Sequence, residues 1–386
     1  MIDRNMAKEL KRLAKLFPVT TVTGPRQSGK TTLVKYVFPK LPYASLENPD
    51  DRQFAETDPN GFLSNYPNGA VFDEVQRVTT LFSYIQGLVD DNPKLKFILS
   101  GSQNFLLLAQ ISQSLAGRVG ILKLLPFSMV ELKRGKLLAN TFETIAHMGF
   151  YPRIFDQNIP PGDFYPNYIQ TYIERDVRQI TQVNDLNSFQ LFLRLCAGRA
   201  GQLLNLSDLA NDASISVNTV KSWLSILEAS YITFRLYPHH KNFNKRLIKM
   251  PKLYFHDVGL LSYLLNIRSP DQIKSHYMRG AIFENFIISD LIKNELHNGR
   301  EPNFYFWRDH KGREIDLIIE KGKKLLPIEI KSGKTVSEDY FKGLEYWKNL
   351  SGDDYEPGIV IYGGDKDQKR SNSKLMSWRS LIGKSL

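Results

Sequence analysis

The chain has 386 residues, of which 42% are hydrophobic and 24% charged, an ordinary globular composition with room for two or three domains. The one cysteine, Cys196, excludes a disulfide within the chain and fits a reducing cytoplasm. Lys and Arg number 51 against 40 Asp and Glu, so the net charge is +11. This excess favours a polyanionic partner, and nucleic acid is the first candidate. The alternative is that the basic surface serves only solubility.

The apolar stretches are too short for a membrane-spanning segment. The longest, such as 318–319 and 359–362, are strand-sized, whereas roughly 20 apolar residues are needed to cross a bilayer. Residues 1–16 alternate charged residues with Leu and Ala and contain no signal-peptide run. We therefore expect a soluble, cytoplasmic protein without a membrane partner.

Residues 1–135 are predicted to form strands that alternate with helices. An apolar, β-branched run at 18–23 ends before a glycine, and residues 30–38 show helical spacing of apolar side chains. Further short apolar runs follow at 70–72 and 97–99. This alternation predicts a parallel sheet that is covered by helices on both faces.

Between the first predicted strand and helix lies Gly24-Pro-Arg-Gln-Ser-Gly-Lys-Thr31, a match to G-x-x-x-x-G-K-[ST]. Its glycines let the loop curl so that backbone N–H groups and the helix N-terminus face phosphate oxygens. Lys30 is predicted to reach the β- and γ-phosphates of ATP, and Thr31 to ligate Mg²⁺. The predicted nucleotide-binding residues are Gly24, Pro25, Arg26, Gln27, Ser28, Gly29, Lys30, Thr31 and Thr32.

Residues 69–74 form an apolar strand that ends in two acids, Asp73 and Glu74. About forty residues after a phosphate loop, such a strand is its expected partner in ATP hydrolysis. Asp73 is predicted to hold Mg²⁺, directly or through water. Glu74 is predicted to orient or deprotonate the attacking water.

Together these residues resemble the AAA+ and related P-loop ATPases. The resemblance implies that residues 96–103 are a sensor strand whose polar tip contacts the γ-phosphate or the attacking water; Ser100, Ser102 and Gln103 are equal candidates. It also implies that Arg118 completes the ATP site of a neighbouring subunit, so that the active form is a homo-oligomer, a ring or at least a dimer. The simpler alternative for Arg118 is a surface arginine without this role.

Residues 136–237 are predicted to be a helical region. Ser207 and Ser216 are predicted to cap two short helices separated by a tight turn. Val220, Trp223, Leu224 and Leu227 have core spacing in the second helix. The unit resembles a winged helix-turn-helix, whose second helix enters the major groove of DNA. The residues implied on its outer face are Asn218, Thr219, Lys221 and Ser222. Because Lys221 is the one basic residue of this helix, a protein-contact module is the alternative.

Residues 238–386 are predicted to be a further α/β part, beginning with a basic connector at 238–246. Two runs that alternate with period two flank Gly322-Lys323, which indicates a β-hairpin with a type II′ turn. In that hairpin, paired residue numbers sum to 645. Asp316 then faces Glu329, and Glu314 faces Lys331, on one side of the sheet.

Carboxylates directly opposite each other destabilise a sheet, and a cation between them removes that cost. Asp316 and Glu329 are therefore candidate Mg²⁺ ligands, with Lys331 positioning or polarising the water in phosphodiester cleavage. The spacing Asp-x(12)-Glu-x-Lys resembles the PD-(D/E)xK nuclease core, which implies a further acid on the preceding helix, here Glu284. The alternative is an exposed charged face on which Lys331 pairs with Glu314.

Taken in order, the motifs resemble a large prokaryotic family of AAA+-type ATPases with a C-terminal domain of unknown function. The segments that carry this resemblance are 24–31, 114–118, 172–177, 204–210, 223–231, 252–261, 306–309 and 328–333. It implies an α/β multidomain protein with a P-loop domain at 1–135, a helical middle at 136–237 and a restriction-endonuclease-like domain at 238–386.

Two functions fit these features. In the first, the ATPase remodels or loads DNA, and Glu284, Asp316, Glu329 and Lys331 cut it. In the second, the ATPase is a nucleotide-gated switch or scaffold, and the C-terminal domain binds protein or DNA without cutting. A small-molecule kinase fits less well, because nothing after residue 135 resembles a lid over an acceptor substrate.

Overall fold

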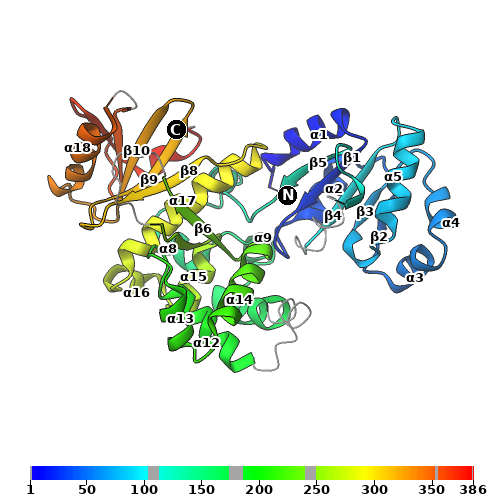
Figure 1. Cartoon of the computed structure of the whole chain (residues 1–386), viewed down its shortest axis with the longest axis horizontal. Coiled ribbons are helices and arrows are strands. Elements are labelled where there is room, and N and C mark those ends of the chain that lie inside the picture. Colours follow the sequence, from blue (N-terminus) through cyan, green and yellow to red (C-terminus); the bar gives the residue numbers. More distant parts are fainter. Residues whose placement is uncertain (1, 103–112, 174–185, 240–248, 353–354, 385) are drawn as a thin grey trace.

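A computed structural model describes residues 2–102, 113–173, 186–239, 249–352, 355–384 and 386. Figure 1 shows a sheet with helices from the N-terminal third, a group of helices from the middle and a second sheet from the C-terminal third. Helix α17 (Arg279–His297) extends from the C-terminal region toward the N-terminal sheet.

The N-terminal sheet is parallel throughout and has the strand order β2-β3-β4-β1-β5. Its strands are β1 (Val19–Thr23), β2 (Tyr43–Ser45), β3 (Val71–Asp73), β4 (Phe97–Gly101) and β5 (Val119–Lys123). The helices around it are α1 (Met6–Leu16), α2 (Lys30–Val37), α3 (Pro49–Thr57), α4 (Pro59–Ser64) and α5 (Leu81–Asp91), with the 3-10 turn η1 (Val75–Arg77) after β3.

Successive strand residues of this sheet enter two separate hydrophobic cores. Phe72 and Leu99 pack with α5 on one face, and Val71 and Ile98 pack with α1 and α2 on the other. A parallel sheet buried on both faces is what strand–helix alternation requires. The predicted α/β class is confirmed.

The helical middle begins after β5. It comprises α7 (Met129–Arg134), α8 (Phe142–Met148), α9 (Pro152–Asp156), α10 (Pro161–Tyr168), the π-helical turn η2 (Ile169–Ile173), α12 (Leu186–Ala197), α13 (Leu206–Asp212) and α14 (Val217–Ala229). Of the predicted helical stretch at 168–178, residues 174–178 lie outside the described residues.

One predicted helix cap is wrong and the other is confirmed. Asn205, not Ser207, begins α13, because its side chain accepts hydrogen bonds from the backbone N–H groups of Ser207 and Asp208. Ser216 caps α14 through the N–H of Thr219. The four residues predicted as the core of α14 are buried: Val220, Trp223, Leu224 and Leu227.

The C-terminal sheet has eight strands in the order β12-β13-β11-β10-β9-β8-β6-β7. They are β6 (Thr233–Pro238), β7 (Lys252–Phe255), β8 (Phe304–Arg308), β9 (Glu314–Lys321), β10 (Lys324–Lys331), β11 (Gly358–Tyr362), β12 (Gln368–Lys369) and β13 (Ser373–Ser377). The associated helices are α15 (Val258–Leu264), α16 (Pro270–Ser275), α17, α18 (Asp339–Ser351) and the 3-10 turn η4 (Trp378–Leu381). Because β6 belongs to this sheet, the sheet extends across the boundary predicted at 237/238. Of the connector predicted at 238–246, residues 240–246 lie outside the described residues.

The register of the β9–β10 hairpin is the one predicted. Lys321 pairs with Lys324 and Leu317 with Ile328, so paired numbers sum to 645. Gly322 has φ +63, as the first central residue of a type II′ turn requires. One hydrophobic core runs from Leu125 through the middle helices to Leu381 and includes the buried face of α17.

Candidate functional site

The phosphate loop, residues 24–31, joins β1 to α2 and curls around the side chain of its own lysine. At Gly24 an added Cβ would lie 2.0 Å from the carbonyl oxygen of Leu124, so only glycine fits. Gly29 has φ +92, in the left-handed region that favours glycine. The Lys30 ammonium donates hydrogen bonds to the carbonyls of Gly24, at 3.0 Å, and Pro25, at 2.8 Å.

A cavity of about 1020 Å³ lies in front of this loop. The helical middle supplies part of its wall through Arg153 and Phe155 of α9. The predicted residues that line it are Arg26, Gln27, Gly29, Lys30, Thr31, Thr32 and Glu74. The cationic side chains of Arg26 and Lys30 on its wall suit an anionic ligand such as a triphosphate.

Asp73 ends β3 beside the loop and is 4% exposed. Its carboxylate accepts hydrogen bonds from three hydroxyls: Thr31 at 2.6 Å, Ser100 at 2.5 Å and Tyr43 at 3.0 Å. Burial and the Asp73 charge raise the pKa of Tyr43 above its usual value, so Tyr43 stays a donor. The hydroxyl of Thr31 and the carboxylate of Asp73 are oxygen ligands of the kind that Mg²⁺ prefers.

Glu74 follows directly and has a left-handed backbone, φ +53, a conformation uncommon for residues other than glycine. Its carboxylate accepts hydrogen bonds from Ser102 at 3.1 Å and Gln76 at 2.5 Å, and it lines the cavity. Of the three sensor candidates, Ser100 thus contacts Asp73 and Ser102 contacts Glu74. Gln103 lies outside the described residues.

Arg118 stands just before β5 and is held by its own chain. Its guanidinium binds both carboxylate oxygens of Asp90 on α5, at 2.5 and 2.9 Å. The side chain is 35% exposed, so this ion pair lies at the surface, where such pairs are weak.

The predicted C-terminal residues meet at the end of the β9–β10 hairpin. The Lys331 ammonium lies 2.5 Å from Glu329 Oε2 and 3.3 Å from Asp316 Oδ2. Asp316 also accepts a hydrogen bond from the backbone N–H of Ile330 at 2.8 Å. Lys331 therefore pairs with both predicted metal ligands, and the alternative pairing with Glu314 is wrong.

Glu284 and Glu314 belong to the same cluster through Lys252, which is not among the predicted site residues. Lys252, 2% exposed at its side chain, pairs with Glu314 and lies 3.1 Å from Glu284. Tyr254 donates a hydrogen bond to Glu284 at 2.5 Å. A lysine at the start of the short apolar strand Lys252–Phe255 was the available signal, since a lysine buried in a strand requires an internal partner.

Burial and the neighbouring charges shift the pKa of three carboxyl groups in this cluster. Burial and the neighbouring Asp316 raise the pKa of Glu329 to about 8. Burial opposes ionisation of Asp316, but Lys331 and Lys252 outweigh it and lower its pKa. The pKa of Glu284 is raised, chiefly by burial. In the described part of the chain, no three His, Cys, Asp or Glu side chains are grouped as metal ligands.

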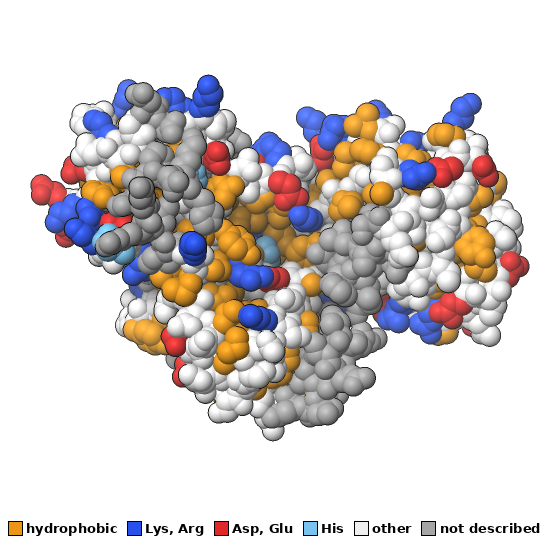
Figure 2. All heavy atoms as spheres, in the orientation of Figure 1, with side chains coloured by type: hydrophobic (Ala, Val, Ile, Leu, Met, Phe, Trp, Pro, Cys, Tyr) orange, Lys and Arg blue, Asp and Glu red, His pale blue; other side chains and the backbone are white. Residues whose placement is uncertain are grey.

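The surface gives limited support to a nucleic-acid contact. On the face that Figure 2 shows, Lys and Arg side chains lie scattered among acidic ones, and the surface is hollowed between the N-terminal and C-terminal regions. On α14, Asn218, Lys221 and Ser222 are exposed, and Thr219 is half-buried. Among the described residues, no helix is both long and apolar enough to cross a membrane.

Comparisons with known proteins identify the class of the N-terminal region. Residues 16–133 match a family described as an AAA domain. Residues 139–271 and 279–381 match two families described as domains of unknown function, DUF8612 and DUF4143. With the phosphate loop and the Asp73–Glu74 strand end, residues 16–133 are an AAA-type P-loop ATPase domain.

Most of the chain is similar to a protein of Mycobacterium tuberculosis. The uncharacterized protein Rv2008c is 30% identical over 340 residues, which are 86% of this chain and 75% of that protein. The chain therefore belongs to the same family as Rv2008c.

Two solved structures are similar in part. The Walker-type ATPase PABY2304 of Pyrococcus abyssi has a TM-score of 0.48 and 16% identity, covering 68% of this chain and 96% of that one. AMPPCP-bound DnaA from Aquifex aeolicus has a TM-score of 0.30 and 14% identity, covering 58% of this chain and 85% of DnaA.

Proposed function

We propose that this protein is a magnesium-dependent ATPase that couples ATP hydrolysis to an action on nucleic acid, DNA first. The observation that carries the ATPase half is that Lys30 and Thr31 line one cavity and that Asp73 accepts a hydrogen bond from Thr31 at its edge. Lys30 would neutralise the β- and γ-phosphates, and Thr31 and Asp73 would hold Mg²⁺, which supplies positive charge to the transferred phosphoryl group.

Glu74 is proposed as the residue that orients or deprotonates the attacking water. Its position at the cavity wall supports this role, as do the hydrogen bonds from Ser102 and Gln76, which fix the direction of its carboxylate. Ser102 is proposed as the sensor residue, because its hydroxyl already contacts Glu74. Arg118 is proposed to act on a neighbouring subunit after release from Asp90.

The action on nucleic acid is proposed for the C-terminal cluster. Asp316 and Glu329 would hold a divalent cation, and Lys331 would position the water for attack on a phosphodiester. The support is that the Lys331 ammonium lies within 3.3 Å of both carboxylates. Lys252 lies 3.1 Å from Glu284 and its charge also lowers the pKa of Asp316. For this role Lys331, which contacts both carboxylates here, would have to turn toward the substrate.

A second candidate is a nucleotide-gated switch whose C-terminal domain binds protein or DNA without cutting. It is favoured by the internal neutralisation of the cluster, because Lys331 and Lys252 together contact all four carboxylates. The two lysines offset part of the carboxylate charge without a metal, and the raised pKa of Glu329, about 8, keeps that group protonated at lower pH.

One experiment separates the two candidates. The purified protein is incubated with plasmid, single-stranded DNA and RNA, with magnesium or manganese, and with or without ATP. Asp316→Asn keeps an acceptor for the Ile330 N–H but removes the charge, and Glu320→Ala on the same strand is the matched control. Cleavage by the wild type and by Glu320→Ala, lost in Asp316→Asn, supports the nuclease. ATP hydrolysis without cleavage in any arm contradicts it and supports the switch.

A further inference from the structure

Arg4, in the segment before α1, contacts the phosphate loop, lines part of the cavity and is 5% exposed. Its guanidinium donates to the carbonyl oxygen of Ser28 at 2.7 Å and to that of Leu125 at 2.6 Å. A third donor, Nε, lies 3.1 Å from Glu131 on α7. The guanidinium also stacks over the ring of Phe127, 4.8 Å from its centroid. A rigid fork of donors thus joins the phosphate loop to the start of the helical middle.

The contact with Ser28 bears on nucleotide binding through peptide geometry. In a trans peptide the C=O and the following N–H point in opposite directions. By holding the Ser28 carbonyl, Arg4 fixes the orientation of the Ser28–Gly29 peptide and therefore the direction of the Gly29 N–H, and Gly29 lines the cavity. That N–H is one of the donors that a phosphate loop offers to its ligand.

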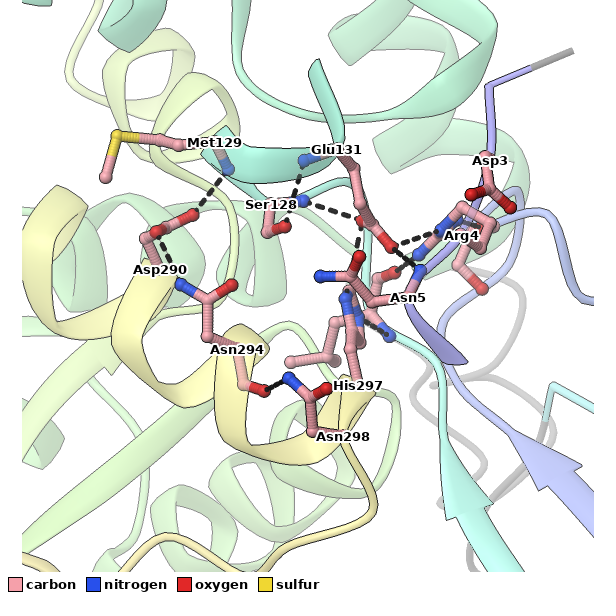
Figure 3. Close-up of polar contacts among 12 residues, drawn as sticks. Asp3, Arg4, Asn5, Ser128, Met129, Glu131, Asp290, Asn294, His297 and Asn298 are labelled. Atoms are coloured by element: carbon pink, nitrogen blue, oxygen red, sulfur yellow. Dashed lines mark hydrogen bonds and ion pairs between the residues drawn. The ribbon is translucent and has the colours of Figure 1, made fainter. Parts of the chain in front are cut away.

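Arg4 is in turn held by a carboxylate that also contacts α17. Figure 3 shows Arg4, Asn5 and His297 gathered around Glu131. Glu131 accepts hydrogen bonds from the backbone N–H groups of Asn5 and Ser128, both at 2.9 Å. Burial opposes its ionisation, but Arg4 and His297 outweigh it and lower the pKa of Glu131 below its usual range.

His297 is the last residue of α17 and is completely buried. Its Nε2 accepts a hydrogen bond from the backbone N–H of Leu125 at 3.2 Å. Its Nδ1 lies 3.4 Å from Glu131, in contact but outside hydrogen-bond geometry. Burial lowers the pKa of His297. Because Nε2 accepts the Leu125 N–H, the proton of the ring lies on Nδ1, which faces Glu131.

We propose that Arg4 is a positioning residue of the phosphate loop and that Glu131 and His297 make its position depend on helix α17. The proposal rests on ATP binding at the phosphate loop. The same helix carries Glu284 thirteen residues before His297, about 20 Å along the axis. Nucleotide binding at the phosphate loop would then affect the His297 end of α17, and the C-terminal cluster would affect the part of the same helix that carries Glu284.

The first test compares two arginines of the same neighbourhood. Arg4→Lys keeps the charge but cannot reach three acceptors. Arg134→Lys alters an exposed arginine that pairs with Asp3 and Asn5 and does not contact the loop. Titration with magnesium and ATP should show about 10-fold or greater loss of affinity in Arg4→Lys and a change within about two-fold in Arg134→Lys. Equal affinity in the two variants would overturn the proposal.

The second test follows α17 itself by hydrogen exchange. Addition of magnesium and ATP should slow amide exchange in residues 286–297 of the wild type. His297→Gln keeps an acceptor for Leu125 but breaks the contact with Glu131, so this slowing should disappear. Asp290→Asn, which alters a contact of α17 with the Met129 N–H and not with Arg4, should preserve it. Slowing in His297→Gln equal to that in Asp290→Asn would refute the link.

These outcomes are separate from failure of the ATP site. If the wild type binds no more ATP than Lys30→Ala, the proposed function fails. If the wild type binds ATP and Arg4→Lys binds it equally well, only the role of Arg4 fails. Should Arg4→Lys not fold, the exchange experiment on His297→Gln decides the link alone.

Discussion

Replacement of Lys252 by methionine should destabilise the C-terminal region, because it removes the internal cation of the acidic cluster. Lys252 is 2% exposed, and its partners Glu284 and Glu314 are 15% and 20% exposed at their side chains. Glu314 keeps an ion pair with Arg308 at 3.0 Å, whereas Glu284 keeps only the Tyr254 hydroxyl among the described residues. One buried carboxylate is left uncompensated, which costs about 3 kcal/mol.

Trp fluorescence during urea unfolding measures this cost, because the four tryptophans all lie at or after residue 223. The double variant Lys252→Met/Glu284→Gln removes both charges, so its free energy of unfolding should lie within about 1 kcal/mol of the wild-type value. The loss in Lys252→Met should also shrink as the pH falls, because protonation of Glu284 removes the unpaired charge. A loss below about 1 kcal/mol, or strict additivity in the double variant, would refute the role of Lys252 as counter-ion.

Three further predictions concern hydrolysis, oligomer formation and pH. Glu74→Gln should keep ATP affinity but lose turnover by about 100-fold or more; unchanged turnover would exclude Glu74 as the water-orienting residue. Arg118→Ala should keep affinity and lose turnover, and mixing it with Glu74→Gln should restore part of the activity; absence of rescue would argue against a shared site. Because the folded-state pKa of Glu329 is raised to about 8, the folded chain binds a proton there between pH 4.5 and 8 that the unfolded chain lacks, so stability falls as pH rises through this window. Glu329→Gln should flatten that slope in unfolding experiments, and an unchanged slope would contradict the shift.

The phosphate loop, the strand end at Asp73–Glu74 and the β9–β10 hairpin could be predicted from the sequence, because each is formed by one short continuous segment. The loop at 24–31 needs glycine backbones and a lysine at fixed spacing, and the strand ending in Asp73–Glu74 has a recognisable pattern. The hairpin register followed from the two-residue turn at Gly322 alone, because turn length fixes which residues pair.

The partners supplied from distant segments could not be predicted. Tyr43 on β2 reaches Asp73 on the neighbouring strand β3, Lys252 on β7 reaches Glu284 on α17, and Arg4 reaches Glu131 over 127 positions. The local sequence does not identify these partners, since each contact depends on the packing of whole elements. The prediction that Ser207 caps α13 was wrong for a local reason, because Asn205 and Ser207 are both good capping residues and lie two residues apart.

The central claim, ATP binding and hydrolysis at the phosphate loop, is tested most directly by Lys30→Ala beside Lys35→Ala. Both lysines lie on α2, but Lys35 is exposed and outside the cavity. With magnesium and ATP, the wild type and Lys35→Ala should bind and hydrolyse the nucleotide, whereas Lys30→Ala should lose binding or turnover, because no other residue replaces its charge on the phosphates. Equal ATPase activity in Lys30→Ala and Lys35→Ala would contradict the assignment of the site.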